Sequence, residues 1–287
     1  MSALAILLVI VAALMHATWN YQLKKSGGGI GILTLSGVIA TTWLTPIALY
    51  MFWQGARLSP AAIAMMAGSG VIHLAYFLLL DRAYRAGGQL SVVYPLARAT
   101  GPLLTILFAV IFLGETMSWL AAGGALLIGF SALMLTGNPA KLLGKDAKAG
   151  VGFALLCGTM IACYTVWDKQ AVSVFLIAPI IFDWGANVAR VSMLVPYTTR
   201  REPGAITKAW RERRSTVLIV GVLSPLSYIL VLTAMVFTPV SYVAPARELA
   251  ILFAALIGTQ VLNEGDTKRR LIASAGMVLG LAGLALG

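Results

Sequence analysis

Long stretches of mostly apolar residues recur along the whole chain, and they constrain its fold more than any other feature. Ten of them have the length of about 20 residues that an α-helix needs to cross a hydrocarbon core about 30 Å thick. Strands of a membrane β-barrel would instead alternate polar and apolar residues over about ten positions. The sequence therefore predicts an all-α integral membrane protein with ten transmembrane helices, at 2–23, 31–53, 61–81, 90–113, 118–136, 150–169, 174–198, 215–236, 239–262 and 269–287.

The composition supports a membrane protein and argues against other classes. Hydrophobic residues make up 60% of the 287 residues and charged residues only 11%, too few to cover the surface of a soluble domain. The net charge of +11 is explained by basic loops, since the chain carries no nucleic-acid-binding motif. Cys157 and Cys163 would lie about 9 Å apart along one helix, too far for a disulfide. We expect a lipid bilayer around the chain and no nucleic acid, metal or cofactor.

The basic residues predict how the chain is oriented. Sixteen of the 21 lysines and arginines lie in the loops that join helices 1–2, 3–4, 5–6, 7–8 and 9–10, whereas the opposite side has only Arg57 and Lys169. The positive-inside rule places the first set of loops in the cytoplasm and both termini outside. We therefore expect a multi-pass protein of the bacterial inner membrane. The first stretch lacks a basic start and a clear cleavage site, so we interpret it as a retained helix.

The two halves of the chain share landmarks at an offset of about 150 residues. "SVVYPLAR" in the fourth stretch corresponds to "SYVAPAR" in the ninth, and "FLGE" at 112–115 corresponds to "VLNE" at 261–264. Five helices in each half would give the two copies opposite orientations, an arrangement common in secondary transporters. We predict a first five-helix repeat over 1–137, a linker over 138–149 and a second repeat over 150–287.

The chain resembles the drug/metabolite transporter superfamily, in its EamA-type branch. The resemblance is carried by "HATWNYQLKK" in the first helix, "PLARATGPLLTILFAVIFLGETMS" in the fourth and "PARELAILFAALIGTQVLNE" in the ninth, and it covers essentially the whole chain. It implies a ten-helix basket around a central cavity. It also implies export of small organic solutes, with amino-acid exporters of the YddG type as one form. Many members place both termini in the cytoplasm, which differs from the orientation that the loop charges predict here.

Ionisable groups inside membrane spans are costly, so they usually face a bundle interior or a wet cavity. In the fourth helix, Tyr94 and Arg98 share a face, and Arg98 could bind a carboxylate or pair with Glu248. In the ninth helix, Pro245 weakens the backbone beside Arg247 and Glu248, which a substrate site often exploits. Glu248 could take up a proton or form a structural ion pair, and Tyr242 flanks it.

Four more helices carry candidate substrate-binding residues. The first helix carries His16, Trp19 and Asn20 on one face, and the third carries His73 and Tyr76. These side chains could line a cavity or could serve only packing. In the seventh helix, Asp183 and Asn187 could bind an amino group or form an internal ladder with Arg190. Aromatic walls for an apolar or cationic group could come from Trp167, Tyr164 and Tyr228, although membrane aromatics are also interfacial anchors.

These observations predict a secondary transporter that exports amino acids or similar small metabolites by alternating access. A lipid-linked metabolite flippase and a multidrug exporter of the same fold are the alternatives. The chain has no HExxH, GxSxG or P-loop motif, so an enzyme is not expected. A small-molecule substrate is the expected partner, and protons are a candidate coupling ion. The GxxxG motif at 276–280 and its counterpart at 125–129 favour close helix packing, either within a monomer or in a homodimer.

Overall fold

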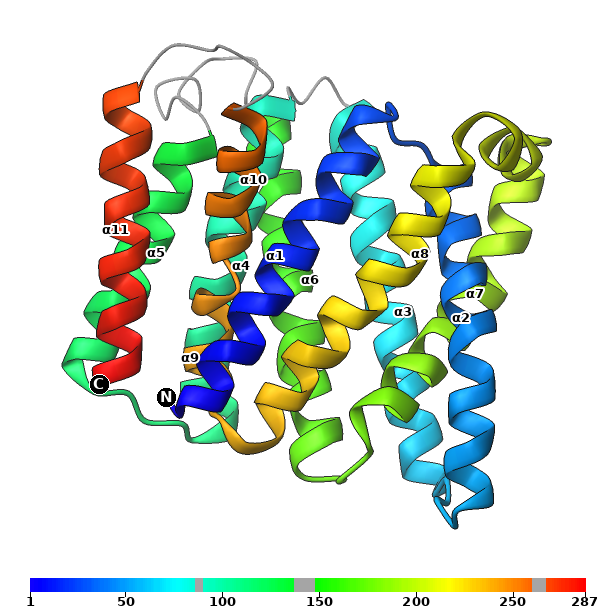
Figure 1. Ribbon diagram of the computed structural model, residues 1–287, viewed down its shortest axis with the longest axis horizontal. Helices are drawn as coiled ribbons and strands as arrows, with labels where there is room; N and C mark the ends of the chain where they lie inside the picture. The colour runs from blue at the N-terminus through cyan, green and yellow to red at the C-terminus, as the bar shows by residue number, and fades with distance from the viewer. Residues whose placement is uncertain (86–89, 137–147, 260–266) are drawn as a thin grey trace.

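The computed structural model describes residues 1–85, 90–136, 148–259 and 267–287. Within these ranges, side chains are described except at 80–85, 90–96, 98–99, 135–136, 148–151, 255–259, 267–268 and 270. The described residues form helices and no strand. The helices are α1 Ala3–Lys25, α2 Ile30–Trp53, α3 Pro60–Arg85, α4 Leu90–Leu113, α5 Trp119–Thr136, α6 Lys148–Ser173, α7 Pro179–Arg201, α8 Ala205–Phe237, α9 Val240–Ala246, α10 Leu249–Thr259 and α11 Thr267–Leu286 (Figure 1).

The all-α prediction is confirmed, and most helix ends lie within five residues of their predicted positions. Among the described residues, four helices are long and apolar enough to cross a membrane, judged by length and composition. They are α1, α2, the part of α3 up to Leu79, and α8. The fourth predicted stretch, 90–113, coincides with α4. Long apolar runs in the sequence therefore located most of the helices.

The sequence predicts no helix over 199–214, between the seventh and eighth stretches, and this prediction is wrong in part. The chain turns at Gly204, whose φ of 83° lies in the left-handed region, and α8 already begins at Ala205. A kink at Arg213, with φ −133° and ψ 29°, separates this basic first segment from the apolar remainder of α8. The many charges of the segment marked the end of a membrane span, but they did not prevent it from forming a helix.

The ninth predicted stretch is two helices, α9 and α10, separated by Arg247 and Glu248. Pro245 has no N–H group to donate to the preceding turn, which weakens the helix at this place. The backbone then tightens, because the N–H of Glu248 donates to the carbonyl of Pro245 at 3.0 Å and that of Ile251 donates to Glu248 at 2.8 Å. Such three-residue steps are typical of a 3₁₀ turn. The break therefore falls beside the two charged residues.

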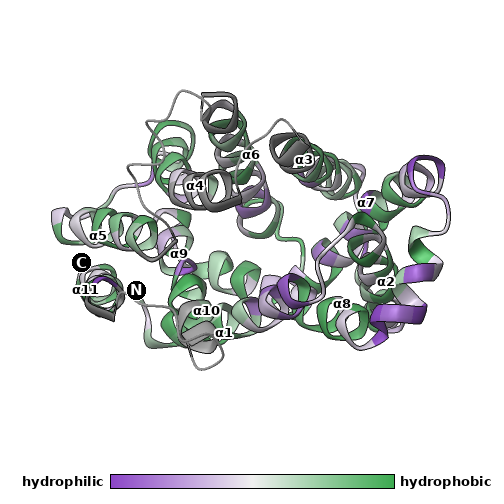
Figure 2. Cartoon of the chain, turned by 90° about the horizontal axis from the view of Figure 1, so that it is seen from above, coloured by the Kyte–Doolittle hydropathy of each residue, from purple (hydrophilic) through white to green (hydrophobic). Residues whose placement is uncertain are grey.

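The helices lie in two rows, seen from above in Figure 2. One row contains α4, α6, α3 and α7, in which α6 packs against α4 and α3, and α3 packs against α7. The other contains α10, α1, α8 and α2, in which α8 packs against α1 and α2. The pair α5 and α11 lies at one end of the rows. Both termini lie at the same edge of the bundle, whereas α1 ends and α8 begins at the opposite edge (Figure 1).

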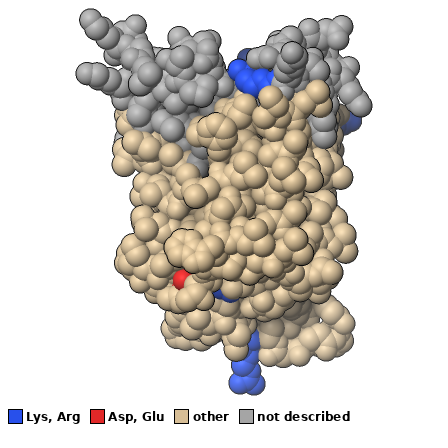
Figure 3. Space-filling view, turned by 90° about the vertical axis from the view of Figure 1, so that its left-hand side faces the viewer, with Lys and Arg blue, Asp and Glu red and all other residues tan. Residues whose placement is uncertain are grey.

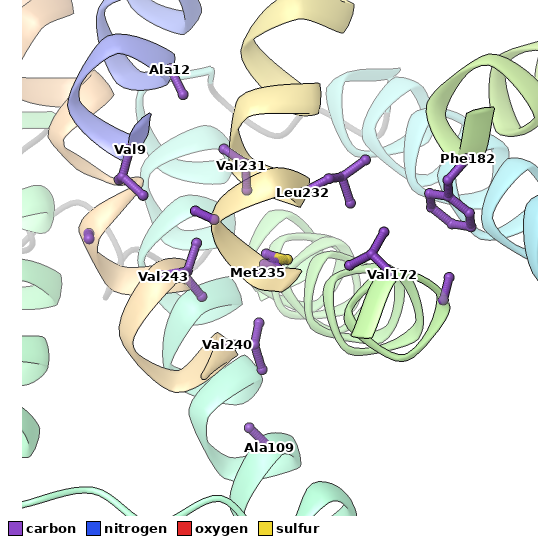
Figure 4. Packing of buried hydrophobic residues seen from close by; sticks show 14 of the residues in the cluster. Val9, Ala12, Ala109, Val172, Phe182, Val231, Leu232, Met235, Val240 and Val243 are labelled. Atoms are coloured by element: carbon purple, nitrogen blue, oxygen red, sulfur yellow. The ribbon is translucent and has the colours of Figure 1, made fainter. Parts of the chain in front are cut away.

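The apolar core lies nearest to the edge that carries the termini. Val9 of α1, Leu232 and Met235 of α8, and Val243 of α9 are fully buried and converge there (Figure 4). The outside of the bundle is apolar as well. On α1, four large residues at steps of three and four are more than one-third exposed, namely Leu4, Leu7, Val11 and Leu14. Most of the described surface in Figure 3 is likewise uncharged. Helices that are apolar on all sides fit a lipid environment.

The helices α5 and α11 pack closely through glycines. A Cβ atom on Gly280 would lie 2.6 Å from the backbone oxygen of Gly124, and one on Gly124 would lie 2.5 Å from the oxygen of Gly280. Both glycines are therefore needed for this approach of the two backbones. The predicted motif at 276–280 thus packs within the chain. Its partner on α5 is Gly124, one residue before the predicted counterpart at 125–129.

Candidate functional site

Aromatic rings from three helices gather between the two rows. The ring of His73 in α3 stacks on that of Tyr164 in α6, with 4.0 Å between centroids and 25° between planes. Tyr228 of α8 meets both rings edge-on, at 5.8 Å from His73 and 6.5 Å from Tyr164. Tyr76 lies one turn after His73 and meets Tyr164 at 6.3 Å. We call these four residues the aromatic cluster.

Asp168 lies beside the aromatic cluster. It follows Tyr164 by one helical turn in α6, so both side chains lie on the same face. Its side chain is fully buried, and one carboxylate oxygen, Oδ2, accepts a hydrogen bond from the hydroxyl of Tyr228. The other oxygen, Oδ1, has no hydrogen-bond partner among the described residues. A buried carboxylate with an unused acceptor is costly for the fold, so the position is suited to bind a proton donor or a cation.

Arg247 brings a positive charge to the same place from the break between α9 and α10. Its side chain is 6% exposed, and its Nη2 donates a hydrogen bond of 3.3 Å to the hydroxyl of Tyr164. Its guanidinium carbon lies 6.0 Å from the centre of the Tyr228 ring, within cation–π distance. Glu248 is the next residue and is 2% exposed. The break in the helix therefore places two buried charges of opposite sign side by side.

A second polar group runs along one face of α7. The side-chain amide of Asn187 donates to the carboxylate and to the backbone oxygen of Asp183, each at 2.9 Å. Arg190 donates to the side-chain oxygen of Asn187, and its guanidinium lies 5.7 Å from the ring centre of Phe77. Asp183 and Asn187 are each 5% exposed. The structure thus contains the internal ladder, which was one of the two interpretations of this spacing.

His73 is oriented by its own helix. Its Nδ1 lies 2.9 Å from the backbone carbonyl of Ser69, which can only accept a hydrogen bond. This contact assigns the ring proton to Nδ1 and leaves Nε2 as an acceptor in the neutral ring. Ser69 itself is fully buried, and its hydroxyl lies 3.2 Å from the same nitrogen.

The candidates on α1 form a separate group. The rings of His16 and Trp19 meet edge-on at 4.7 Å, and the side-chain amide of Asn20 donates to the carbonyl of His16 at 2.8 Å. All three side chains are half-buried. Because α1 packs mainly against α8 and α10, these residues lie on the row opposite to α3 and α6. The described structure brings them together with one another rather than with the aromatic cluster.

The remaining candidates fall in three places. Trp167 donates from its indole nitrogen to the carbonyl of Met65 at 2.8 Å, and therefore ties α6 to α3. Tyr242 lies beside the C-terminus, with its hydroxyl 3.5 Å from the oxygen of Gly287, and it lines a surface pocket of about 180 Å³ there. Tyr94 and Arg98 belong to α4, but their side chains lie outside the described residues. The pairing of Arg98 with Glu248 therefore stays a prediction.

Sequence reasoning missed Asp168 as a site residue. The residue is adjacent to Lys169 near the predicted end of the sixth helix, so the pair looked like a polar boundary of the membrane span. In the structure α6 continues to Ser173. Its correspondence to Asn20 in the repeat, and its spacing of four residues from Tyr164, were the available signals. The sequence places Arg247 next to Glu248 and Tyr164 near Trp167, but it does not indicate that the two residues join two helices at the cluster.

The turn between α8 and α9 is held from two sides. Glu115, which follows α4, accepts hydrogen bonds at its two carboxylate oxygens from the first backbone N–H groups of α9, Val240 at 2.8 Å and Ser241 at 2.9 Å. A negative charge at a helix N-terminus is stabilising, because it meets the free N–H groups and the positive end of the helix dipole.

Lys169 makes the complementary contact at the end of α8. Its Nζ donates to the carbonyl oxygens of Met235 at 2.6 Å and Thr238 at 3.1 Å. A cation favours a helix C-terminus for the converse reason. We call Glu115 and Lys169 together the turn clamp. The clamp fixes the start of α9, and hence one end of the short segment that carries Arg247.

Metal ligands are not gathered in the described part of the chain, where no three His, Cys, Asp or Glu side chains lie close enough together to hold an ion. The groups available for binding are instead aromatic rings, carboxylates and guanidinium groups. Such a set suits organic molecules that carry charge and apolar surface.

Comparisons with known proteins point to the same class. Residues 148–286 match the model of the EamA-like transporter family. A solved structure titled "Crystal structure of protein" has a TM-score of 0.79, covers 98% of this chain and 97% of its own, and is 17% identical. That likeness shows a shared fold. No curated protein matches the chain. The family that this half of the chain matches is a family of transporters.

Proposed function

We propose that this protein is a secondary transporter that exports amino acids or similar small zwitterionic metabolites by alternating access. The observation that carries the proposal is the meeting of the aromatic cluster with Asp168 and Arg247 inside a bundle whose core is mostly apolar. Charged groups at membrane depth are costly and usually serve transport, so two opposite charges beside four rings support a site for a molecule with both charges.

Each group of a zwitterion has a counterpart in this proposal. The guanidinium of Arg247 binds the carboxylate, through the paired N–H geometry that arginine offers to carboxylates. The unused oxygen of Asp168 accepts from the ammonium group. The rings of His73, Tyr76 and Tyr228 contact the side chain of the substrate, and can also bind a cation through their faces. When no substrate is bound, Arg247 and Asp168 are held by Tyr164 and Tyr228 respectively.

The other predicted residues take supporting places in the proposed site. Asp183 and Asn187 belong to the α7 ladder, which is suited to exchange hydrogen bonds when α7 moves. We also propose that Tyr94, Arg98, Glu248, His16, Trp19, Asn20, Trp167 and Tyr242 border the substrate pathway. Of these, Tyr242 is the weakest candidate, because its hydroxyl lies at the edge of the bundle beside the C-terminus.

We further propose that the two halves, 1–137 and 150–287 with the linker 138–149 between them, are inverted repeats of five membrane spans, counting α9 and α10 as one. The packing supports this, because contacts recur when the halves are exchanged. The pairs α1–α8 and α3–α6 correspond, and so do α2–α8 and α3–α7, and α1–α10 and α4–α6. A family model that matches 148–286 alone is consistent with a repeat of that length. Two similar halves can exchange conformations and so alternate access.

The proposed location is the bacterial inner membrane, with both termini outside the cytoplasm. The support is that Lys24, Lys25 and the basic segment 200–214 lie at the edge of the bundle away from the termini (Figure 1). Reporter fusions after Gly287 test the orientation, and we expect activity from an extracytoplasmic reporter. Activity from a cytoplasmic reporter would contradict the orientation and leave the fold unaffected.

The function is tested with purified protein in liposomes. We expect counterflow of at least one labelled amino acid above empty liposomes, and a change of its rate when a pH gradient is imposed if protons are coupled. If only quaternary ammonium cations are transported among the compounds tested, the result would favour the multidrug exporter. Movement of a lipid-linked metabolite between leaflets, without amino-acid counterflow, would favour the flippase.

A further inference from the structure

The first segment of α8 forms a basic hook at the edge of the bundle opposite the termini. The segment begins at Ala205 and ends at the kink at Arg213, after which the apolar part of α8 continues to Phe237. Hydrophilic residues gather at this end of the molecule, near α2, α7 and α8 (Figure 2). The proposed transport mechanism does not use this hook, and the substrate-binding interpretation of the sequence did not include it.

The hook is packed firmly against the bundle. Ala209 is 5% exposed and belongs to a small apolar cluster with Ile32 of α2 and Val217 of α8. The backbone of Ala205 lies so close to α2 that a Cβ atom on Gly31 would be 2.4 Å from the Ala205 oxygen. The polar face of the hook therefore has a defined position relative to the membrane spans.

A pocket of about 580 Å³ opens at the kink, lined by Trp210, Arg211, Glu212, Arg213, Arg214, Ser215 and Thr216. Three of these seven residues are arginines and one is a glutamate, so the lining carries a net positive charge. No ion pair within the described residues neutralises the three guanidinium groups. Thr216 is 9% exposed and contributes a hydroxyl group to the lining. The pocket thus combines three guanidinium groups with a hydroxyl group.

The chemistry of this lining is that of a phosphate site. Guanidinium groups bind phosphate oxygens through paired N–H donors, and hydroxyl groups donate to the remaining oxygens. An isolated pocket with these groups could hold a soluble phosphate or a lipid headgroup. The position of Trp210 favours the lipid. Its ring is 43% exposed, and the guanidinium of Arg214 lies 5.8 Å from its centre.

Tryptophan is enriched at the level of lipid headgroups, where its apolar ring contacts chains and its N–H contacts water. Here the ring belongs to the same pocket as the arginines and lies where α8 enters its apolar span. Basic residues next to a membrane span are attracted to anionic lipids by about 1 kcal/mol each. We propose that the pocket at the Arg213 kink binds the phosphate headgroup of an anionic phospholipid, with Arg211, Arg213 and Arg214 contacting the phosphate, Thr216 donating to it and Trp210 packing on the lipid.

Native mass spectrometry of the full-length protein in detergent, titrated with phosphatidylglycerol or phosphatidylcholine, tests this site. The pocket variant carries Arg211→Gln, Arg213→Gln and Arg214→Gln. The matched control carries Arg200→Gln, Arg201→Gln and Lys208→Gln, which removes the same charge at the same edge and leaves the pocket lining intact. We expect the wild type and the control to bind one phosphatidylglycerol at least about tenfold more tightly than phosphatidylcholine, and the pocket variant to lose this preference.

A second variant, Thr216→Val, distinguishes loss of the site from misfolding and from a general effect of charge. The substitution changes neither the net charge nor the size of the side chain. We expect it to weaken phosphatidylglycerol binding about fivefold, the loss of one hydrogen bond of about 1 kcal/mol. Equal loss in the pocket and control variants would overturn the site, because binding would then follow overall charge. Binding of glycerol phosphate as tight as that of the lipid would overturn the lipid as the ligand. Neither result depends on which metabolite the protein transports.

Discussion

The α5–α11 pair and the polar centre of the molecule hold helices together by opposite means. At the rim, Gly124 and Gly280 let two backbones touch, and the contact contains no charge. At the centre, Asp168, Tyr228 and Arg247 join α6, α8 and the break after α9 by polar contacts between bulky side chains. Both contacts lie inside an apolar molecule, so the surroundings do not explain the difference.

The two kinds of contact differ in what they cost the fold and in what they can do for transport. Close packing through glycines buries no charge, and the two backbones fit together in one arrangement only. Such a contact suits helices that move as a unit. A buried cluster of charges costs stability unless every group is satisfied, and it has several hydrogen-bonding arrangements. We therefore expect substitutions in the α5–α11 contact to lower the free energy of unfolding. Substitutions in the polar centre should instead lower the rate of transport.

The largest effect is expected at the rim. Gly280→Leu places a side chain where a Cβ atom alone would lie 2.6 Å from the Gly124 oxygen and 2.6 Å from Ile128. We expect a loss of about 3 kcal/mol in the free energy of unfolding, measured by denaturant unfolding in detergent. Transport per folded molecule should be unchanged. The control is Gly123→Leu, because no atom lies within 4 Å of a Cβ there and the residue is exposed. Equal stability of the two variants would contradict the packing argument.

At the centre, Asp168→Asn should act on transport. The substitution keeps the shape of the side chain and removes the charge and an acceptor of the buried carboxylate. We expect a decrease of about 30-fold in counterflow, equivalent to about 2 kcal/mol, the size of a hydrogen bond to a charged group. The unfolding midpoint should stay near that of the wild type. The exposed Glu202→Gln serves as the control, and a wild-type rate for Asp168→Asn would remove this residue from the mechanism.

Two tyrosines allow a sharper test of position. Tyr228→Phe removes the hydroxyl that donates to Asp168, and we expect counterflow to fall about tenfold. Tyr242→Phe removes a hydroxyl that lies 3.5 Å from its acceptor at the edge of the bundle, and we expect a change of less than about twofold. Initial rates at several substrate concentrations measure both. If Tyr242→Phe has the larger effect, the proposed site lies at the wrong place in the bundle.

The smallest effect is expected at the turn clamp. Glu115→Gln replaces a carboxylate that accepts two backbone hydrogen bonds by an amide that can accept only through its single oxygen. We expect a loss of about 1 kcal/mol in the free energy of unfolding, because the charge at the start of α9 is lost. The measurement is repeated at high salt, which should reduce the difference between the variant and the wild type. A difference that salt does not change would mean that the charge of Glu115 is not what stabilises α9.

Much of the fold was predictable because a membrane allows few kinds of backbone structure to cross it. The span at 90–113 was located to the residue, and helix ends elsewhere differed by a few residues. The two exceptions have local causes. The segment from Ala205 is helical despite its charges, because the apolar face around Ala209 packs on α2. The break at Arg247 follows from Pro245, which the sequence marked as a weak point without showing how far the helix would open.

The candidate site was predictable only in part. His73, Tyr76 and Tyr228 were predicted from single polar or aromatic residues in apolar helices, and they lie in one cluster. Asp168 was missed because its neighbour Lys169 suggested the end of a span. The α7 ladder was one of two interpretations that the spacing of Asp183, Asn187 and Arg190 allowed, since periodicity places side chains on one face without choosing their partners.

By itself, the sequence determined the helical class and the position of most helices, because hydropathy acts over whole segments. Tertiary structure decided which residues meet. It placed Tyr164 beside Tyr228 and Arg247, each of which follows it by more than 60 residues, and it paired Gly124 with Gly280. Such contacts depend on how the helices pack side by side. The order of residues along the chain does not specify that packing directly.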